Sequence, residues 1–210
     1  MHHDADGRGQ PGLVVYELII MLGRRSLLLG VASFVALAGT GARAEQPILT
    51  DDGLYKQPWF LESFLDLGDD LEGARKEGKR FAIMWELRGC PYCKETHLVN
   101  FAQPRISDYV KANFEVLQLN IIGSRKVTDF DGTELSEKEL AAKYGVRFTP
   151  TFQFFAEAAG SLKNLPPAKR EVARSPGYLR PDDFLAMFRY VREKVYESKS
   201  FRDYLKALPS

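Results

Sequence analysis

Cysteine and histidine are scarce in this chain, whose 210 residues contain two cysteines and three histidines. A domain stapled by several disulfides needs more cysteines, so that class of protein is excluded. Long apolar runs are also missing: the apolar stretch at residues 26–39 is shorter than the about 20 residues that a membrane-spanning helix needs. The sequence contains no internal repeat and no low-complexity segment.

An excess of charge of one sign is missing as well. The net charge is +1, and the part of the chain after residue 44 carries equal numbers of basic and acidic side chains. Nucleic acids and anionic membrane surfaces attract basic proteins, so we expect neither as a partner. That part of the chain is long enough for one domain with a sizeable core.

Residues 21–44 have the pattern of a cleavable signal peptide. Arg24 and Arg25 form the positive start, residues 26–39 the apolar stretch, and residues 42–44 an Ala-Arg-Ala cleavage site. We therefore expect export to an oxidising compartment, the bacterial periplasm, and a mature chain beginning near residue 45. An apolar anchor that is never cleaved is the alternative.

Two further expectations concern export. The Arg24-Arg25 pair allows the twin-arginine route as well as the general secretory route. Residues 1–20 carry acidic side chains and make a poor leader, so Met21 is the expected start and the segment before it a non-native leader. No cysteine lies near the cleavage site, which excludes a lipid anchor and leaves no stable membrane anchor after cleavage.

The two cysteines lie together in Cys90-Pro91-Tyr92-Cys93, directly after the apolar run at residues 81–85. A strand that leads into a C-x-x-C at the start of a helix is typical of a dithiol redox site. One helical turn brings residues three apart onto one face, so a bridge between the two sulfurs needs little backbone movement.

The two sulfurs are expected to have different roles. Cys90 precedes the helix, with Pro91 at the first helical position, and the unpaired N–H groups there favour a thiolate. Cys90 is therefore the expected nucleophile, and Lys94 adds positive charge nearby. Cys93 lies one turn deeper, keeps its proton longer and then resolves the mixed disulfide.

Three other interpretations of the pair are weaker. Zinc needs about four ligands, whereas Cys90, Cys93 and His97 supply three, so no metal is expected. Haem attachment needs a histidine where Lys94 stands. A purely structural disulfide would close a short loop and stabilise the fold little.

Apolar periodicity and turn signals predict an alternating α/β chain, which folds as a mixed sheet with helices on both faces. The first predicted elements are a helix with Leu67, Leu71 and Ala74 that ends at Gly78, a strand at 81–86, a helix from Cys90 to about Phe101 with Leu98 on its apolar side, and a helix at 104–110. A strand through Leu117, Leu119 and Ile121 follows, then a helix capped by Ser136 and Glu139 that ends at Gly145, a strand at 151–155 and an edge strand at 171–174. The last two are a helix from Pro181 with Phe184, Phe188, Val191 and Val195 along one stripe, and a terminal helix with Phe201, Tyr204, Leu205 and Leu208.

This order, with C-P-Y-C after one strand and Thr149-Pro150 before another, resembles the thioredoxin fold over residues 65–197. Residues 45–64 are then an N-terminal extension, and residues 198–210 a C-terminal helical extension. The resemblance implies a cis bond before Pro150 and a substrate-binding platform made by Thr149, Pro150, Pro91 and Tyr92, with no cofactor. An ordinary strand-initiating proline is the alternative for Pro150.

A closer resemblance is to the SoxW-type periplasmic thioredoxins of the bacterial sulfur-oxidation system. That family reduces periplasmic disulfides with electrons from a membrane protein of the CcdA/DsbD kind. The motifs that carry this resemblance are GCPYCK at 89–94, LNI at 119–121, VTDFDG at 127–132 and GVRFTPT at 145–151.

The chain departs from cytoplasmic thioredoxin at several positions. Gly89 replaces the usual tryptophan and Met84 the buried aspartate. Glu86 is either the replacement proton-transfer group or a solvated strand end. Residues 122–135 are an insertion, either a plain surface loop or a partner-selecting loop, and their Asp-x-Asp-Gly is too short for a calcium loop.

The expected function is thiol–disulfide oxidoreduction, most simply the reduction of disulfides in exported proteins. An oxidant or isomerase that uses the same steps, and a non-catalytic thioredoxin-like binding module, remain alternatives. C-P-Y-C is also the glutaredoxin motif, but export argues against a role with cytosolic glutathione. Proteins of sulfur oxidation are the expected substrates, and proteins of c-type cytochrome maturation the nearest alternative.

Overall fold

The computed structural model describes residues 45–208. The predicted leader and signal peptide, and the last two residues of the chain, lie outside this range. Within it, no helix has both the length and the apolar character needed to cross a membrane.

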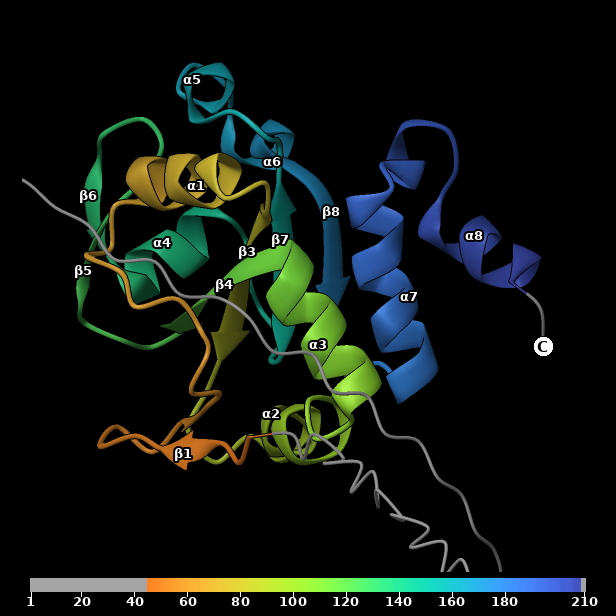
Figure 1. Cartoon of the computed structure of the whole chain (residues 1–210). Coiled ribbons are helices and arrows are strands. Elements are labelled where there is room, and N and C mark those ends of the chain that lie inside the picture. The colour runs from red at the N-terminus through yellow and green to blue at the C-terminus, as the bar shows by residue number, and fades with distance from the viewer. Residues whose placement is uncertain (1–44, 209–210) are drawn as a thin grey trace, which may run out of the picture. The chain divides into compact units, whose positions relative to one another are not determined.

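A four-stranded mixed sheet forms the centre of the fold, in the order β4-β3-β7-β8 (Figure 1). β3 (Arg80–Glu86) pairs parallel with β4 (Phe114–Asn120) and antiparallel with β7 (Thr151–Phe155). β8 (Glu171–Pro176) pairs only with β7 and forms an edge, as predicted. Every residue of β3 is buried, because both faces of the sheet are covered.

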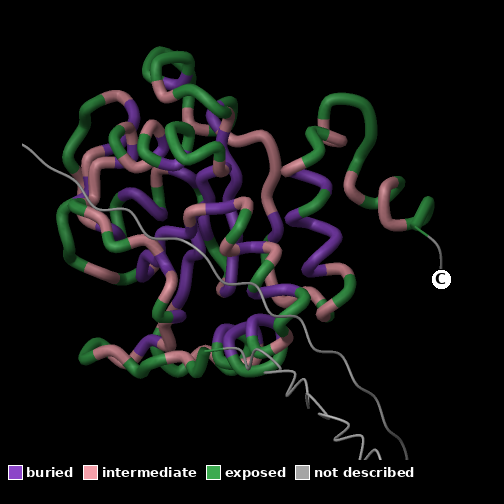
Figure 2. Tube along the Cα trace, viewed as in Figure 1, coloured by how far each residue is buried: buried purple, intermediate pink, exposed green. Residues whose placement is uncertain are grey.

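Helices cover both faces of the sheet, which confirms the predicted α/β architecture. On one face lie α3 (Pro104–Asn113) and α7 (Pro181–Arg192), and on the other lie α1 (Leu67–Lys76) and α4 (Glu137–Lys143). The buried positions concentrate in the strands and on the inner sides of these helices (Figure 2). The aromatic stripe of α7 is core: Phe184 and Phe188 pack edge-on against Phe152 of β7.

Two helix ends follow local signals as predicted. The Ser136 hydroxyl accepts the backbone N–H of Glu139, and the Glu139 carboxylate accepts the N–H of Ser136, which makes a complete capping box. Gly78, with φ +70°, lies just beyond the end of α1, in a conformation that favours glycine.

The prediction for Leu98 is wrong. The helix after Cys90 is α2 (Pro91–Glu95), which continues as the π-helical turn η1 (Thr96–Asn100). Leu98 is 38% exposed, whereas the polar residues His97 and Asn100 are fully buried. The sequence pattern placed the apolar side chain inward, but buried hydrogen-bonding partners hold the polar ones there instead.

The predicted stripe of α7 also extends too far. The helix ends at Arg192, because Lys194 takes the left-handed conformation with φ 56°. Val195 therefore begins a separate turn, η2 (Val195–Glu197), although it still packs against the core. The terminal helix is α8 (Phe201–Ala207), whose inner side rests on the same core through Phe201 and Tyr204.

Two small hairpins flank the sheet. The N-terminal extension contains β1 (Ile48–Leu49) and β2 (Tyr55–Lys56), and the insertion contains β5 (Lys126–Thr128) and β6 (Glu134–Ser136). The insertion is thus not a plain surface loop, since Val127 and Phe130 are buried in the core. Two short helices that the sequence pattern did not indicate, α5 (Ala159–Leu162) and α6 (Pro167–Arg170), connect β7 to β8.

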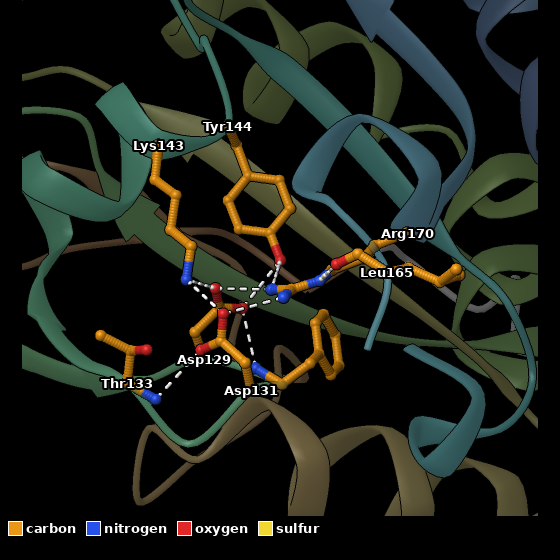
Figure 3. Close-up of polar contacts among 8 residues, drawn as sticks. Asp129, Asp131, Thr133, Lys143, Tyr144, Leu165 and Arg170 are labelled. Atoms are coloured by element: carbon orange, nitrogen blue, oxygen red, sulfur yellow. Dashed lines mark hydrogen bonds and ion pairs between the residues drawn. The ribbon is translucent and has the colours of Figure 1, made fainter. Parts of the chain in front are cut away.

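An ion cluster fixes the insertion to the rest of the domain (Figure 3). Arg170 of α6 donates to Asp129 at 2.7 Å and to Asp131 at 2.8 Å. Lys143 of α4 pairs with both carboxylates, and the Tyr144 hydroxyl donates to Asp129 at 2.7 Å. The two aspartates of the Asp-x-Asp-Gly motif therefore form ion pairs with Lys143 and Arg170.

Candidate active site

Cys90 stands where the chain turns from β3 into α2. It is the N-cap residue of α2, with Pro91 at the first helical position. The backbone N–H of Cys93 donates to Cys90 Sγ at 3.1 Å, so the two cysteines lie within one helical turn, as their spacing predicts. Both are free thiols; Cys90 is partly exposed and Cys93 is buried.

The Thr149-Pro150 peptide bond lies directly beside Cys90. This bond is cis, as the fold resemblance implies. The Cys90 thiol donates to the Thr149 carbonyl oxygen at 3.4 Å, although 59 residues separate the two in sequence. The Pro150 carbonyl accepts the N–H of Gly177 at 2.7 Å, which holds the loop after β8 next to the cis bond.

Cys93 occupies a very different environment from its neighbour. Burial raises the pKa of the Cys93 thiol, and its hydrogen bond with Cys90 and the negative charge of Glu86 raise it further. Cys93 therefore keeps its proton at a pH where an exposed cysteine has begun to lose it. A buried thiol of this kind needs a proton acceptor before it can attack a disulfide.

Glu86, at the end of β3, is not a solvated strand end. Its side chain is 1% exposed, and both carboxylate oxygens have partners. Oε1 lies 2.9 Å from His97 Nε2, and Oε2 accepts from Gln118 Nε2. His97 thus contacts a carboxylate, and no group of three or more metal-ligating side chains occurs between residues 45 and 208.

A cavity of about 360 Å³ joins the two cysteines to Glu86. Its other walls come from Leu87, Gly89 and Lys94, and from the N-terminal hairpin at Gly53, Leu54 and Tyr55. The Lys94 ammonium lies 5.9 Å from the centre of the Tyr55 ring. The N-terminal extension therefore forms part of the site's wall, which its sequence gave no reason to expect.

The profile of the thioredoxin-like domain family matches residues 67–192, which is more than half of the chain. The chain belongs to the thioredoxin-like family.

The solved structures with a similar fold include a thioredoxin-fold protein from Helicobacter pylori, with 20% identity and a TM-score of 0.54 over 70% of this chain and 86% of that one. A thioredoxin from Thermus thermophilus has 25% identity and a TM-score of 0.44 over 60% of this chain and 83% of that one. No curated protein matches the chain at a significant level.

In this thioredoxin-like domain, two stacked tyrosine rings lie next to the dithiol. Tyr92, between the cysteines, is 55% exposed and stacks on Tyr178 with ring centres 5.8 Å apart. The Tyr178 hydroxyl donates to Asn100 Oδ1 at 3.2 Å, which connects the loop after β8 to the helix of the dithiol. Phe148, just before the cis bond, is 66% exposed.

Sequence reasoning placed the cysteines, Thr149, Pro150 and Glu86 together, and the structure brings all of them to one end of the sheet. It missed the neighbours of Glu86. His97 could have been recognised, because it follows Cys93 by four residues and so lies on the same helical face. Gln57, Gln118 and Tyr178 lie on other elements, and no local pattern marks them.

Proposed function

We propose that this thioredoxin-like protein is a thiol–disulfide oxidoreductase that reduces disulfides of exported proteins. The main support is that its two sulfurs lie in different environments. Cys90 is accessible beside the Thr149 carbonyl, whereas Cys93, one turn away, is buried with a raised pKa. Proteins of this fold are generally thiol–disulfide oxidoreductases, which supports the same conclusion.

The chemistry proceeds in two exchange steps. The Cys90 thiolate attacks one sulfur of the substrate disulfide; that bond breaks, a Cys90–substrate disulfide forms, and the other substrate sulfur leaves as a thiolate. Cys93 then loses its proton and attacks the Cys90 sulfur. The Cys90–Cys93 disulfide forms, the second substrate thiolate leaves, and two electrons have passed to the substrate.

Glu86 is the proposed proton acceptor for Cys93. Its charge contributes to the raised pKa of Cys93, and both residues line the same cavity. A carboxylate that takes the proton generates the attacking thiolate at neutral pH, a contribution of about 10²–10⁴-fold for general base catalysis. The cavity gives the proton a route to solvent afterwards.

Thr149 and Pro150 are the proposed platform for substrate. An extended segment that carries the disulfide can pair with the backbone before Pro150, as an added strand does, and this presents its sulfur to Cys90. Pro91 and Tyr92, both exposed next to Cys90, complete the proposed platform. The exposed rings of Tyr92 and Phe148 favour apolar residues on either side of the substrate cysteine.

The periplasm is the proposed location, with a membrane protein of the CcdA/DsbD kind as electron donor. Support comes from the signal-peptide pattern at residues 21–44 and from a chain whose only two cysteines form one dithiol. The motif resemblance to SoxW-type thioredoxins favours proteins of sulfur oxidation as substrates. An oxidant or isomerase would use the same residues in another direction.

The reduction potential of the Cys90–Cys93 pair tests this proposal. The protein is equilibrated with glutathione or dithiothreitol buffers, and the thiol and disulfide forms are counted by mass after alkylation. A potential near the about −270 mV of thioredoxin supports a reductase, whereas one near the about −120 mV of DsbA makes the protein a disulfide donor.

A binding module without activity is tested separately. Replacing Cys93 with serine removes the resolving thiol, so an enzyme accumulates Cys90-linked mixed disulfides with its substrates. The matched Cys90→Ser variant lacks the nucleophile and should accumulate none. If the Cys93→Ser variant traps no partner and the two sulfurs never interconvert, the protein is a non-catalytic module.

A further inference from the structure

The N-terminal extension places one buried glutamine against the dithiol helix. Gln57 follows β2, and its side chain is fully buried. Its amide nitrogen lies 3.2 Å from His97 Nδ1 and 3.3 Å from the His97 carbonyl oxygen. The two hydrogens of one amide group therefore both point at a single residue.

This contact decides where His97 carries its proton. A flipped amide would set Gln57 Oε1 against the His97 carbonyl oxygen, and two acceptors would then face each other. With nitrogen in that place, Gln57 donates to Nδ1, so Nδ1 is unprotonated and the hydrogen of the neutral ring is on Nε2. Nε2 is the atom that lies 2.9 Å from Glu86 Oε1, and it donates to that carboxylate.

We propose that Gln57 and His97 are positioning residues of the redox site. Gln57 holds His97 in its Nε2–H form, and His97 with Gln118 holds the Glu86 carboxylate at the cavity that it shares with Cys93. The proposal rests on the proposed function, because it concerns the step in which Cys93 resolves the mixed disulfide.

The extension is tied to this network at a second point. Gln118 Nε2 donates both to Glu86 and to the Tyr55 carbonyl oxygen, the latter at 2.5 Å. Gln57 Oε1 accepts no hydrogen bond from the residues described, an arrangement that is uncommon for a buried amide. Gln57 is therefore better explained by the hydrogen bond that its nitrogen donates to His97 than by a contribution to the stability of the fold.

The proton balance of the step is simple. The Cys93 thiol gives its proton to Glu86, the thiolate attacks Cys90, and His97 keeps its Nε2 hydrogen throughout. The other titratable or charged groups that line the shared cavity are Tyr55 of β2, Cys90 at the N-cap of α2 and Lys94 of α2. Glu86 itself bonds to His97 of η1 and to the neutral Gln118 of β4.

Two-phase reaction of the full chain with the aromatic disulfide dithiobis(nitrobenzoate) tests the proposal. Attack by Cys90 releases one nitrothiobenzoate and leaves the other on its sulfur; closure by Cys93 releases the second. We expect Gln57→Leu to leave the first phase unchanged. It should slow the second about tenfold, the order expected when one hydrogen bond to a charged network is lost. The rise of the second phase with pH should also move to higher pH.

Gln153→Leu is the matched control. Gln153 is equally buried but bonds to Trp85 and Glu171, away from the dithiol, so both phases should keep their wild-type rates. If Gln57→Leu closes the disulfide at the wild-type rate and pH, the positioning role is overturned. If the wild-type protein itself never releases the second equivalent, the proposed function fails instead.

A second measurement needs no variant. The ¹⁵N chemical shifts of the His97 ring in the reduced protein report directly which nitrogen is protonated. The proposal expects the hydrogen on Nε2, with Nδ1 unprotonated. A hydrogen on Nδ1 in the neutral ring would overturn it, whatever the exchange rates are.

Discussion

Two of the polar clusters in the domain are built on opposite principles. The ion cluster under the insertion sets two carboxylates, Asp129 and Asp131, against the cations of Arg170 and Lys143 (Figure 3). The redox-side cluster sets one carboxylate, Glu86, among Gln118, His97 and Gln57, whose donors need no positive charge. The ion cluster ties the insertion to the fold, whereas the redox-side cluster meets a cavity and the dithiol.

This difference decides which carboxylate suits the proposed proton transfer. Burial alone would raise the pKa of Asp131, but hydrogen bonds from Arg170, Lys143 and Thr133 hold it well below its usual range, which makes it a poor proton acceptor. Glu86 has no Lys or Arg side chain bonded to it in the described chain, and it lines the same cavity as Cys93. It is therefore the carboxylate that we propose as the proton acceptor.

The largest effect on the chemistry is expected at Glu86. Glu86→Gln keeps the size of the side chain but removes the proton acceptor, so closure of the disulfide by Cys93 should slow by about 10²-fold or more. Stopped-flow release of the second nitrothiobenzoate measures this rate. Glu137→Gln is the control, because Glu137 is an equally buried glutamate that bonds to Arg125 and to the backbone of Asn120. Equal closure rates in both variants would remove Glu86 from the mechanism.

The ion cluster should respond in stability and not in chemistry. Arg170→Met removes the more deeply buried of the two cations that pair with Asp129, so the free energy of unfolding should fall by about 3–5 kcal/mol. Urea unfolding measures the loss, and both phases of disulfide exchange should remain unchanged below the transition. A loss under about 1 kcal/mol would show that the cluster contributes no more to stability than an exposed ion pair does.

The two clusters should also give the stability of the protein different pH dependences. The folded pKa of Asp131 lies below the ordinary value of 3.8, so its contribution to stability is present above that pH and is lost as the pH falls further. The folded pKa of Cys93 lies above the ordinary value of 9.0. The reduced protein should therefore lose stability as the pH rises past 9.

Single replacements show which residue causes the loss of stability at low pH and which causes the loss at high pH. Unfolding of the reduced protein is followed across the pH range in the wild type, Asp131→Asn and Cys93→Ala. The loss of stability in acid should become smaller in Asp131→Asn but not in Cys93→Ala, and the loss that begins near pH 9 should become smaller in Cys93→Ala but not in Asp131→Asn. A loss at higher pH should remain in both variants, because burial also raises the pKa of Tyr144. A loss near pH 9 that is unchanged in Cys93→Ala would contradict the assignment to Cys93.

The smallest effect is expected at the cap of α4. Ser136→Ala removes one side of the capping box and should lower the free energy of unfolding by about 1 kcal/mol. The exchange kinetics should not change, because the cap supports the insertion side of the molecule. Thermal unfolding measures the loss, and a change in the rate of disulfide closure would contradict the separation of the two clusters.

The sequence predicts the sheet, its order of elements and the dithiol well because these depend on short-range signals. Apolar runs, the capping box and the C-x-x-C spacing each involve residues a few positions apart. The neighbours of Glu86 could not be predicted in the same way, since Gln57 reaches His97 across 40 positions and Gln118 reaches Glu86 across 32.

The wrong prediction for Leu98 has the same origin. Apolar patterning assumes that the buried side of a helix is apolar, but here the buried side carries His97 and Asn100, held by partners from other elements. The ion cluster was likewise hidden, because Arg170 lies on a short helix 41 positions from Asp129. Polar clusters assembled from distant segments leave no periodic signal in any one of them.

In the proposed mechanism the two sulfurs are unequal, with Cys90 attacking and Cys93 resolving. The most direct test is alkylation of the reduced protein with iodoacetamide across a pH series, with each cysteine followed separately by mass spectrometry. We expect Cys90 to react first at every pH, and Cys93 to react slowly until the pH is well above the ordinary range for a thiol. Equal rates at the two positions, or faster reaction at Cys93, would contradict the account.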